Sequence, residues 1–517
     1  MNVEKNMGYF FPLLFIHSKY LQIKNINYTY NLPSHYFLTL RLRLFKTPLS
    51  SLISPSHINR DQKYFINTQK ETVMFMSYSR EYSNTIIKNE QVMRRGIHYK
   101  NEVKGVIAPQ ISSRQSWKEN TIHNKNTNLT YSFSRAYTLW DYDRTFQQNA
   151  YISLFNPAQI HQAKIAMQSW ADVANISFTE ASADSSANIL FLNFQRPSNV
   201  AGYAYYPNPG SFSPIWINYS FSDNQHPSRL NDGGGVLTHE IGHALGLGHS
   251  HAPHGYTQQM SVMSYLSEQG SGANYGQHYL STPQMYDIAA IQYLYGANLH
   301  TRTGDTVYGF NSTSYRDHFT ATHASDALIF CVWDAGGNDT FDFSGYKQNQ
   351  MINLNELCFS DVGGLKGNVS IAADVTIENA IGGSGHDDII GNHTNNILTG
   401  NGGSDQLWGN GGNNTFRYAS ARDSMTTSPD TIHDFKSGRD KIDLSQLMPS
   451  TDRVIFVDRL SFNGQTEMGQ QYNEVADITY LMIDFDAQVS ECDMMIKFTG
   501  RHHFTANDFI LSTSLTA

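Results

Sequence analysis

The sequence has few cysteines and no long apolar run, and each absence excludes a class of protein. Only Cys331, Cys358 and Cys492 occur among the 517 residues, an odd number at distant positions. Neither a disulfide framework nor a cysteine-based zinc site is therefore expected, although a single pairing stays open. No segment approaches the roughly 20 apolar residues that cross a membrane. Residues 9–16 lack the cleavage site of a signal peptide.

Basic residues are also fewer than acidic ones. The chain has 36 Lys+Arg against 45 Asp+Glu, which gives a formal net charge of −9 and a pI near 6.1. It therefore offers no overall basic surface for nucleic acid. What is abundant is glycine, with 38 residues, and aromatic residues at 13%. Both indicate β-rich structure with many turns, in a chain long enough for two or three domains.

The composition and residue pattern change three times along the sequence. Residues 1–73 show no clear periodicity and are interpreted either as translated upstream sequence, with the natural start at Met74 or Met76, or as a poorly ordered N-terminal extension. A peptide spanning residues 40–73 in mass spectra of the native product would contradict the first interpretation. Residues 74–109 are polar and basic, as in a detachable leader of a zymogen. Residues 110–298 mix helix and strand patterns, with a helix expected from Pro157. Residues 299–517 are dominated by Gly, Asn and Asp.

The run HEIGHALGLGH carries the chemistry. His239 and His243 are four residues apart, so a helix places both on one face, where two imidazoles can bind zinc. Gly246 can end the helix in a left-handed conformation and return the chain, which brings His249 in as a third ligand. Three protein ligands leave a coordination position open for water, as in catalytic sites. Zinc lowers the pKa of that water to about 7, and Glu240 is placed to take its proton as general base.

Met263 and Tyr265, which follow the histidine run in the sequence, complete this predicted site. In the stretch SVMSY, Met263 is expected to form a hydrophobic floor under the metal. Tyr265 can offer its phenol to zinc or to the developing oxyanion. The sequence therefore predicts a metalloendopeptidase with catalytic residues Glu240 and Tyr265.

Four glycine-rich copies follow with a period of nine, beginning at Gly382, Gly391, Gly400 and Gly409. Two nonapeptides make one turn of a parallel β-roll, so positions 18 apart stack. Asp387 and Asp405 stack in this register and predict one good calcium site. Their counterparts on the other side, Asn396 and Asn414, are neutral and predict weaker binding. The inward apolar positions are Ile389, Leu398, Leu407 and Phe416.

Together these motifs resemble a known family. HExxHxxGxxH with a Met-turn is the metzincin signature, and the repeats behind it resemble the serralysins, bacterial secreted metalloproteases with a repeats-in-toxin domain. The similarity runs over roughly residues 130–510 and includes residues 168–180, 287–298, 302–312, 332–346 and 361–372. It implies an α+β metzincin catalytic domain followed by an all-β parallel β-roll and sandwich.

The resemblance also implies roles for individual residues. Zinc would be held by His239, His243, His249 and Tyr265, with Glu240 as general base. The implied structural calcium ligands are Arg302, Gly304, Thr306, Asp334, Gly336, Gly337, Asp339, Thr376, Glu378, Gly383, Gly385, Asp387, Asn392, Thr394, Asn396, Gly400, Gly403 and Asp405.

Further expectations concern export and partners. The resemblance implies a secreted, extracellular bacterial monomer that acts on protein substrates, takes part in virulence and meets a periplasmic protein inhibitor. Export would use a type I (ABC) secretion apparatus that reads a C-terminal signal, for which residues 508–511 are the candidate, or an ordinary last strand. Ser250 replaces the usual proline, and the chain between His249 and Met263 is short for the group, so peptide preference is left open.

Two alternatives stand beside this prediction. One is a non-enzymatic calcium-binding surface or adhesin module with a structural zinc site, which Glu240 disfavours because a structural site needs no base. The other is an astacin- or matrixin-type protease, which the repeats and the cysteine positions disfavour.

Overall fold

The structure is a computed structural model that divides into two units, residues 1–94 and residues 95–517. It describes residues 21–31, 35–44, 63–68, 71–74, 116–117, 126–133, 151–182, 187–207, 212–251, 255–448, 454–457, 459–462, 465–485, 492–512 and 515–516.

The first unit contains one four-stranded sheet. Its strands, in sheet order, are β1 (Leu21–Asn31), β2 (His35–Leu44), β3 (Lys63–Thr68) and β4 (Glu71–Met74). They fall on the predicted N-terminal extension, whose two interpretations both remain predictions. The predicted leader, residues 74–109, lies outside the described residues except for Met74.

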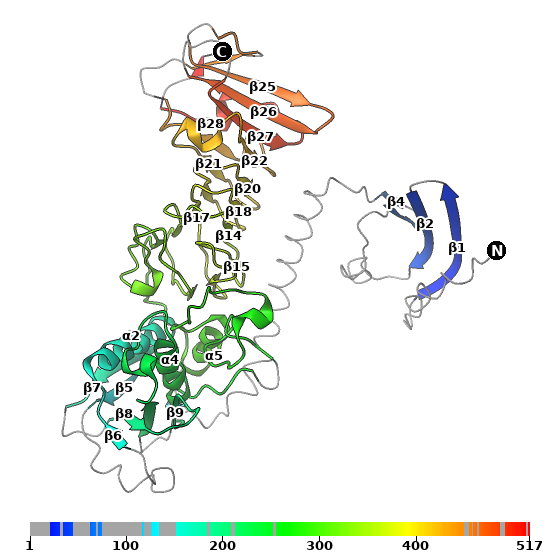
Figure 1. Ribbon diagram of the computed structural model, residues 1–517. Coiled ribbons are helices and arrows are strands. Elements are labelled where there is room, and N and C mark those ends of the chain that lie inside the picture. Colours follow the sequence, from blue (N-terminus) through cyan, green and yellow to red (C-terminus); the bar gives the residue numbers. More distant parts are fainter. Residues whose placement is uncertain are drawn as a thin grey trace. The chain divides into compact units, whose positions relative to one another are not determined.

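The N-terminal part of the second unit is built on a mixed sheet with the order β7-β5-β8-β10-β9, and β6 also pairs with β8 (Figure 1). Its strands are β5 (Thr127–Ser132), β6 (Tyr151–Ser153), β7 (Ile176–Glu180), β8 (Ile189–Gln195), β9 (Gly202–Ala204) and β10 (Ser213–Asn218). β5, β7, β8 and β10 run parallel, whereas β9 is antiparallel to β10 at the end of the sheet.

Four helices of the described residues accompany this sheet, and the first and third of them contact its strands. They are α2 (Pro157–Val173), α3 (Ser222–Gln225), α4 (Asp232–Ala244) and α5 (Met285–Tyr295), with a 3₁₀ turn at Glu268–Ser271. Asn156 caps α2, whose first residue is proline, as expected from the sequence. Trp170 on the apolar face of α2 is fully buried, and its Nε1 donates to the carbonyl of Thr238, 3.2 Å away. This contact ties α2 to α4.

The repeat part is a parallel β-roll. Its first sheet has the order β11 (Val307–Gly309), β13 (Thr340–Asp342), β17 (Asn379–Ile381), β19 (Ile397–Thr399), β21 (Thr415–Arg417), β23 (Lys441–Asp443) and β28 (Phe509–Ile510). The second has the order β14 (Met351–Asn353), β18 (Asp388–Ile390), β20 (Gln406–Trp408), β22 (Asp430–Ile432), β27 (Met494–Thr499), β26 (Ile478–Asp484), β25 (Glu467–Asn473), β24 (Val454–Val457) and β29 (Leu515–Thr516). A third, smaller sheet holds β12 (Phe330–Val332), β16 (Val369–Ile371) and β15 (Phe359–Ser360). Short 3₁₀ turns lie at Asp317–Phe319, Ala421–Ser424 and Ala506–Asp508.

The predicted register of the roll is confirmed. Asp388 pairs with Gln406, and Ile397 pairs with Thr415, each 18 residues apart. The four predicted inward side chains are at most 1% exposed. Figure 1 shows β18, β20 and β22 stacked in succession.

The roll extends beyond the four repeats that the sequence shows. Leu407 in β20 pairs with Ile432 in β22, 25 residues later, and Phe416 in β21 pairs with Ile442 in β23, 26 residues later. The longer connections keep the stacking but break the period of nine. The antiparallel strands β25, β26 and β27 then continue the second sheet as the sandwich part.

A buried ion-pair cluster joins the roll to the N-terminal part of the second unit. Asp172 of α2 accepts from Arg302 at 3.0 Å and from Arg316 at 2.7 Å. Trp333 Nε1 donates to the carbonyl of Asn298 at 2.9 Å. The three cysteines all lie in the described residues and form no disulfide, as expected. Among the described residues, none of the helices has the length and hydrophobicity that a membrane crossing requires.

Candidate active site

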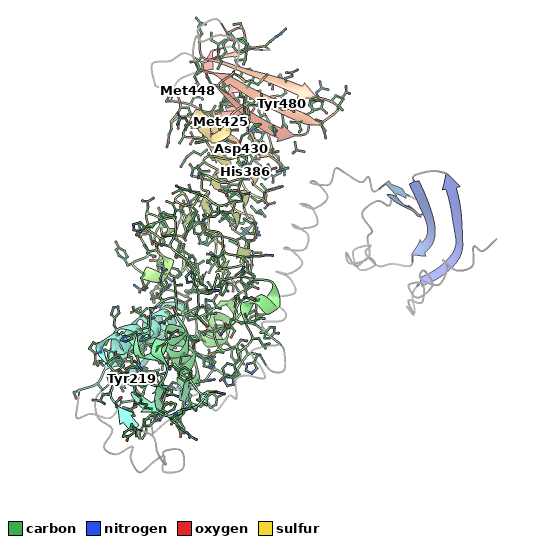
Figure 2. All side chains as sticks on the ribbon, in the orientation of Figure 1. Tyr219, His386, Met425, Asp430, Met448 and Tyr480 are labelled. Carbon is green, nitrogen blue, oxygen red and sulfur yellow. The ribbon has the colours of Figure 1, made fainter. Side chains whose placement is uncertain are left out.

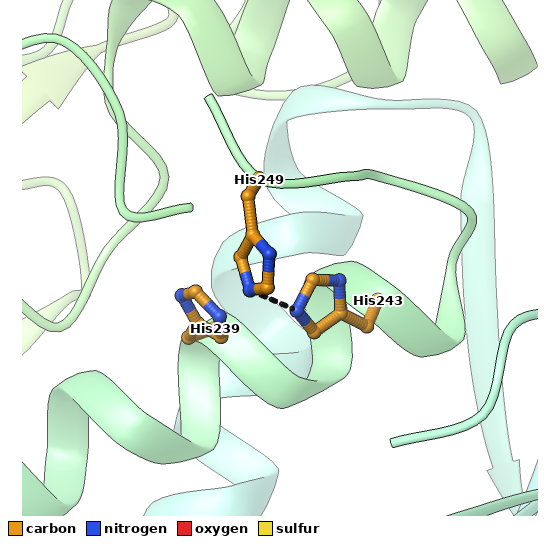
Figure 3. A group of neighbouring side chains, drawn as sticks. All are labelled: His239, His243 and His249. Carbon is orange, nitrogen blue, oxygen red and sulfur yellow. Dashed lines mark hydrogen bonds between the residues drawn. The ribbon is translucent and has the colours of Figure 1, made fainter. Parts of the chain in front are cut away.

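The end of α4 brings the three predicted histidines together. His239 and His243 lie on one face of the helix, which ends at Ala244. Gly246 follows with φ 106°, a conformation that L side chains rarely adopt, and the chain turns back so that His249 lies over the helix (Figure 3). One ring nitrogen of each histidine lies within 4.8 Å of those of the other two.

Hydrogen bonds fix the orientation of two of these rings. Nδ1 of His239 lies 2.8 Å from the carbonyl of Val262, and Nδ1 of His243 lies 2.7 Å from the carbonyl of Leu247. Because a carbonyl only accepts, each Nδ1 carries the proton and each Nε2 presents a lone pair. Nε2 of His243 faces Nε2 of His249 at 3.1 Å (Figure 3). Nε2 of His239 is buried and has no hydrogen-bond partner among the described residues.

These features fit a zinc ion. Burial is the main reason that the pKa of His239 falls to about 3 and that of His243 to about 4, so both rings stay neutral, the form that binds metal. The 3.1 Å separation is close to the edge of a tetrahedron with metal–nitrogen bonds of about 2.05 Å, roughly 3.3 Å. A cation between the rings would satisfy lone pairs that otherwise face each other.

Glu240 follows His239 in α4 and is not part of the group formed by the three histidines. It is 5% exposed, its Oε2 has no hydrogen-bond partner among the residues described, and burial raises its pKa to about 8. Gly202 in β9 packs directly against it, since a Cβ at that position would lie 3.0 Å from Oε1 of Glu240. The edge strand thus helps to set the position of the carboxylate, which the sequence did not indicate.

We expect Gly202→Ala to lower kcat about 10- to 100-fold, because the added methyl displaces the Glu240 carboxylate, the general base expected from the sequence, and small misplacements of such a group are costly. The measurement is casein hydrolysis at matched zinc content. Gly402→Ala is the control, because a Cβ there meets no heavy atom within 4 Å. An unchanged kcat in Gly202→Ala would show that the contact does not position Glu240.

The predicted Met-turn lies beneath the helix, and a residue that the sequence reasoning missed holds it. Met263 is 1% exposed, and its Sδ lies against Gly242 of α4. The buried carboxylate of Asp287, in the first turn of α5, accepts from Ser261 Oγ at 2.6 Å and from Val262 N at 2.7 Å. Since the Val262 carbonyl bonds to His239, Asp287 supports the orientation of that ring. The signal in the sequence was its position as an acidic residue at the start of an apolar helical pattern, where it can cap the helix.

Tyr265 joins the histidines, as predicted. Its ring is stacked on that of His239, with centroids 5.4 Å apart and planes at 18°, and its centroid is 4.5 Å from that of His249. The side chain is nevertheless 65% exposed. Tyr206, just beyond β9, presents its edge to His243 at 5.7 Å. Two phenols therefore flank the histidine cluster.

The predicted calcium ligands of the first loop also lie together. Asp339 Oδ1 accepts from Thr306 N at 2.8 Å, and Glu378 Oε2 accepts from Asp339 N at 2.7 Å. Gly336 N donates to Asp334, Gly304 O accepts from Thr306 Oγ1, Gly337 packs against Gly304, and Thr376 is half-buried two residues before Glu378. The guanidinium of Arg302 is a cation that only donates, here to Asp172 and to the Trp333 carbonyl, so Arg302 can offer a calcium ion only its backbone carbonyl.

One side of the roll carries a column of buried carboxylates. Asp405 Oδ1 accepts from Asp387 N, and Asp430 Oδ1 accepts from Asp405 N, both at 2.8 Å. Asp430, labelled in Figure 2, continues the column although the sequence reasoning missed it. Oδ2 of Asp405 and of Asp430 has no hydrogen-bond partner among the described residues, and burial raises the pKa of both carboxyls. The predicted glycines lie in the turns around this column, at Gly383, Gly385, Gly400 and Gly403.

On the other side of the roll, asparagine side chains occupy the positions that aspartates occupy in the carboxylate column. Asn396 Nδ2 donates to the Glu378 carbonyl at 2.9 Å and to Asn392 Oδ1 at 3.0 Å. Thr394 N and Oγ1 also donate to Asn392 Oδ1. The structure therefore brings these three predicted ligands together through hydrogen bonds of their own.

Comparison with known proteins agrees with this architecture. Residues 123–296 match the family model described as Matrixin, and residues 297–511 match the model described as Peptidase M10 serralysin C terminal. Serralysin A of Dickeya chrysanthemi is 47% identical over 422 residues, which cover 77% of this chain and 87% of that protein. Metalloprotease AprA of Pseudomonas entomophila is 48% identical over 385 residues, covering 68% of this chain and 79% of that protein. Serralysin of Photorhabdus luminescens is 45% identical over 395 residues, covering 70% and 80%.

The two matched family models cover both α4 and the repeats, which favours an enzyme over a calcium-binding adhesin module and over a matrixin-type protease without repeats. The chain belongs to the serralysin family of zinc-dependent metalloendopeptidases.

Proposed function

We propose that His239, His243 and His249 hold the zinc of this endopeptidase and that Glu240 is its general base. The observation that carries this assignment is the convergence of three ring nitrogens, two of them with their Nδ1 groups held by carbonyls, beside a buried carboxylate. When bound, zinc supplies Lewis-acid chemistry that polarises the scissile carbonyl and makes water a stronger acid.

The residues of the chain divide the remaining work. Glu240 accepts the proton of the attacking water and delivers it to the leaving nitrogen. Tyr265, beside the histidines, donates its phenol to the developing oxyanion or adds a zinc ligand. The substrate lies extended and antiparallel to the free edge of β9, near Tyr206. This placement is supported by the end position of β9 in its sheet.

The zinc assignment predicts that His239→Ala and His249→Ala lose most of their bound zinc, because two nitrogens hold the metal far more weakly than three. Tyr265→Phe should keep its zinc but lose roughly 10-fold or more in kcat. Zinc is counted by mass spectrometry and kcat is measured on casein. The matched control is His278→Ala, an exposed histidine outside the cluster. Full zinc occupancy in His249→Ala would contradict the assignment.

Calcium is proposed for the carboxylate column and for the first loop. Asp387, Asp405 and Asp430 are buried and form no ion pair among the described residues, and Asp334 and Asp339 lie with the half-buried Glu378 beside the segment that begins at Arg302. Oxygen ligands of this kind, together with turn carbonyls, suit Ca²⁺. Asp430 is an addition to the ligands expected from sequence.

The asparagine side is proposed to bind calcium weakly, and one substitution tests this. Asn414 N donates to Asp440 Oδ1 at 2.9 Å, and Asp440 is already paired with Arg439 at 3.2 Å. Asn414→Asp adds a charge beside Asp440, and we expect one further tightly bound Ca²⁺ and a steeper dependence of thermal stability on calcium. Calorimetric titration counts the ions. Asn395→Asp, at an exposed position, is the control, and equal stoichiometry in both variants would contradict the idea.

Export and localisation complete the proposal. The chain leaves a bacterial cell unfolded through a type I secretion apparatus and folds when it meets extracellular calcium, because binding free energy adds to folding free energy. The candidate signal supports this order of events, since Asp508 is buried and Phe509–Ile510 form β28 in the folded roll. In this proposal residues 74–109 are a propeptide, residues 110–298 the catalytic domain and residues 299–517 the calcium-binding domain. The secreted monomer acts in virulence and meets a periplasmic protein inhibitor.

A further inference from the structure

Tyr265 is placed beside the zinc-binding histidines although little of the protein covers it. Its side chain is 65% exposed. A tyrosine this exposed has several rotamers open to it, so burial does not fix where its phenol lies. Contacts with neighbouring groups must therefore decide how often the phenol occupies a working position.

His251, which has no part in the proposed mechanism, makes two such contacts with Tyr265. The ring of His251 is stacked on that of Tyr265, with centroids 4.8 Å apart and planes at 27°. The backbone N–H of Tyr265 also donates to Nδ1 of His251, at 3.4 Å. Both the ring and the main chain of Tyr265 are thus in contact with one imidazole.

The two chain segments are tied together at this point. Ser250 N donates to the Met263 carbonyl at 3.2 Å, so the residues after His249 run beside the Met-turn. Gly255 N donates to the His251 carbonyl at 2.8 Å, which fixes the backbone of His251 from its other side. His251 therefore projects from an anchored backbone onto Tyr265.

We propose that His251 is a positioning residue that holds Tyr265 over the metal-binding histidines. The inference rests on the role proposed for Tyr265. The ring of His251 also lies beside that of His249, with centroids 5.2 Å apart and planes at 41°, so the zinc content of each His251 variant shows whether the metal ligand itself is disturbed. His251 acts by raising the fraction of molecules in which the phenol is in place.

The two contacts can be separated by substitution. His251→Phe keeps an aromatic face and loses the nitrogen acceptor, whereas His251→Asn keeps an acceptor near the position of Nδ1 and loses the ring. His251→Ala loses both. Because aromatic stacking is a modest interaction, we expect His251→Ala to lower kcat roughly 3- to 10-fold, with little change in KM and with full zinc content. His251→Phe should restore most of the loss.

The decisive comparison places His251→Ala in a Tyr265→Phe background. If His251 acts through the phenol, the second substitution lowers kcat no further, because the group it positions is already gone. Equal losses in both backgrounds would overturn the proposal, as would an unchanged kcat in His251→Ala alone.

A measurement without catalysis separates this proposal from the role of Tyr265 in the reaction. With Cu²⁺ in place of zinc, a phenolate bound to the metal gives a charge-transfer absorption band, and Tyr265→Phe abolishes it. We expect a weaker band in His251→Ala than in the parent protein, and equal bands would overturn the proposal. If Tyr265→Phe leaves kcat unchanged, the catalytic role of Tyr265 is wrong, and this band alone then decides whether His251 positions the ring.

Discussion

Replacing Glu240 by glutamine is expected to lower kcat for casein by about 10²- to 10⁴-fold while leaving the zinc content unchanged. Glutamine has nearly the same shape, so the packing against Gly202 is preserved. It cannot accept the proton of the attacking water, however, and that is the function assigned to the carboxylate. Because Glu240 is not among the three residues that form the metal cluster, the metal should stay bound.

The control for this experiment is Glu474→Gln, an exposed glutamate in the C-terminal part of the roll. A parallel sample of the parent protein treated with a zinc chelator should lose activity and regain it when zinc is restored. If Glu240→Gln retains both its zinc and the kcat of the parent protein, another group must accept the proton. If it loses zinc as well, Glu240 has a structural role that the geometry does not indicate.

The second large effect concerns the pH dependence of the roll, which should reverse when calcium is removed. Without calcium, burial raises the pKa of Asp339 to about 7 and that of Asp387 to about 6, and it raises those of Asp405 and Asp430 as well. A carboxyl with a raised pKa binds its proton more tightly in the folded state. Its contribution is therefore complete below the unfolded pKa of about 3.9 and is lost as the pH rises through the folded pKa.

In a calcium chelator the roll should consequently be largely unfolded at pH 8, as the export proposal requires, and should show a measurable unfolding transition only nearer pH 5, where its buried carboxyls are protonated. In excess calcium the order reverses, because the ligands must be ionised and acid competes with the metal. Scanning calorimetry of the full chain measures both. The double variant Asp405→Asn with Asp430→Asn should show a smaller pH dependence in chelator and less stabilisation by calcium. A roll that is equally stable at both pH values without calcium would contradict this account.

Local sequence determined the parts of the site that depend on neighbours along the chain. The spacing of His239 and His243 fixes their common helical face, and Gly246 allows the turn that returns His249, so the metal cluster follows from a single short run. The same holds for the roll. A period of nine determines which residues stack 18 positions apart and which of them point inward.

Tertiary structure decided what depends on contacts between distant segments. Asp430 enters the carboxylate column 25 residues after Asp405, where a longer connection hides the repeat from any periodic reading. Asp287 supports the Met-turn, Gly202 bounds the general base, and His251 stacks on Tyr265, although none of these pairs has a fixed spacing or a pattern. Such contacts are set by how packed elements approach one another, and a linear sequence carries no local signal of that approach. The grouping of the three histidines could therefore be predicted from sequence, whereas the residues that contact Glu240, the Met-turn and Tyr265 could be found only in the folded chain.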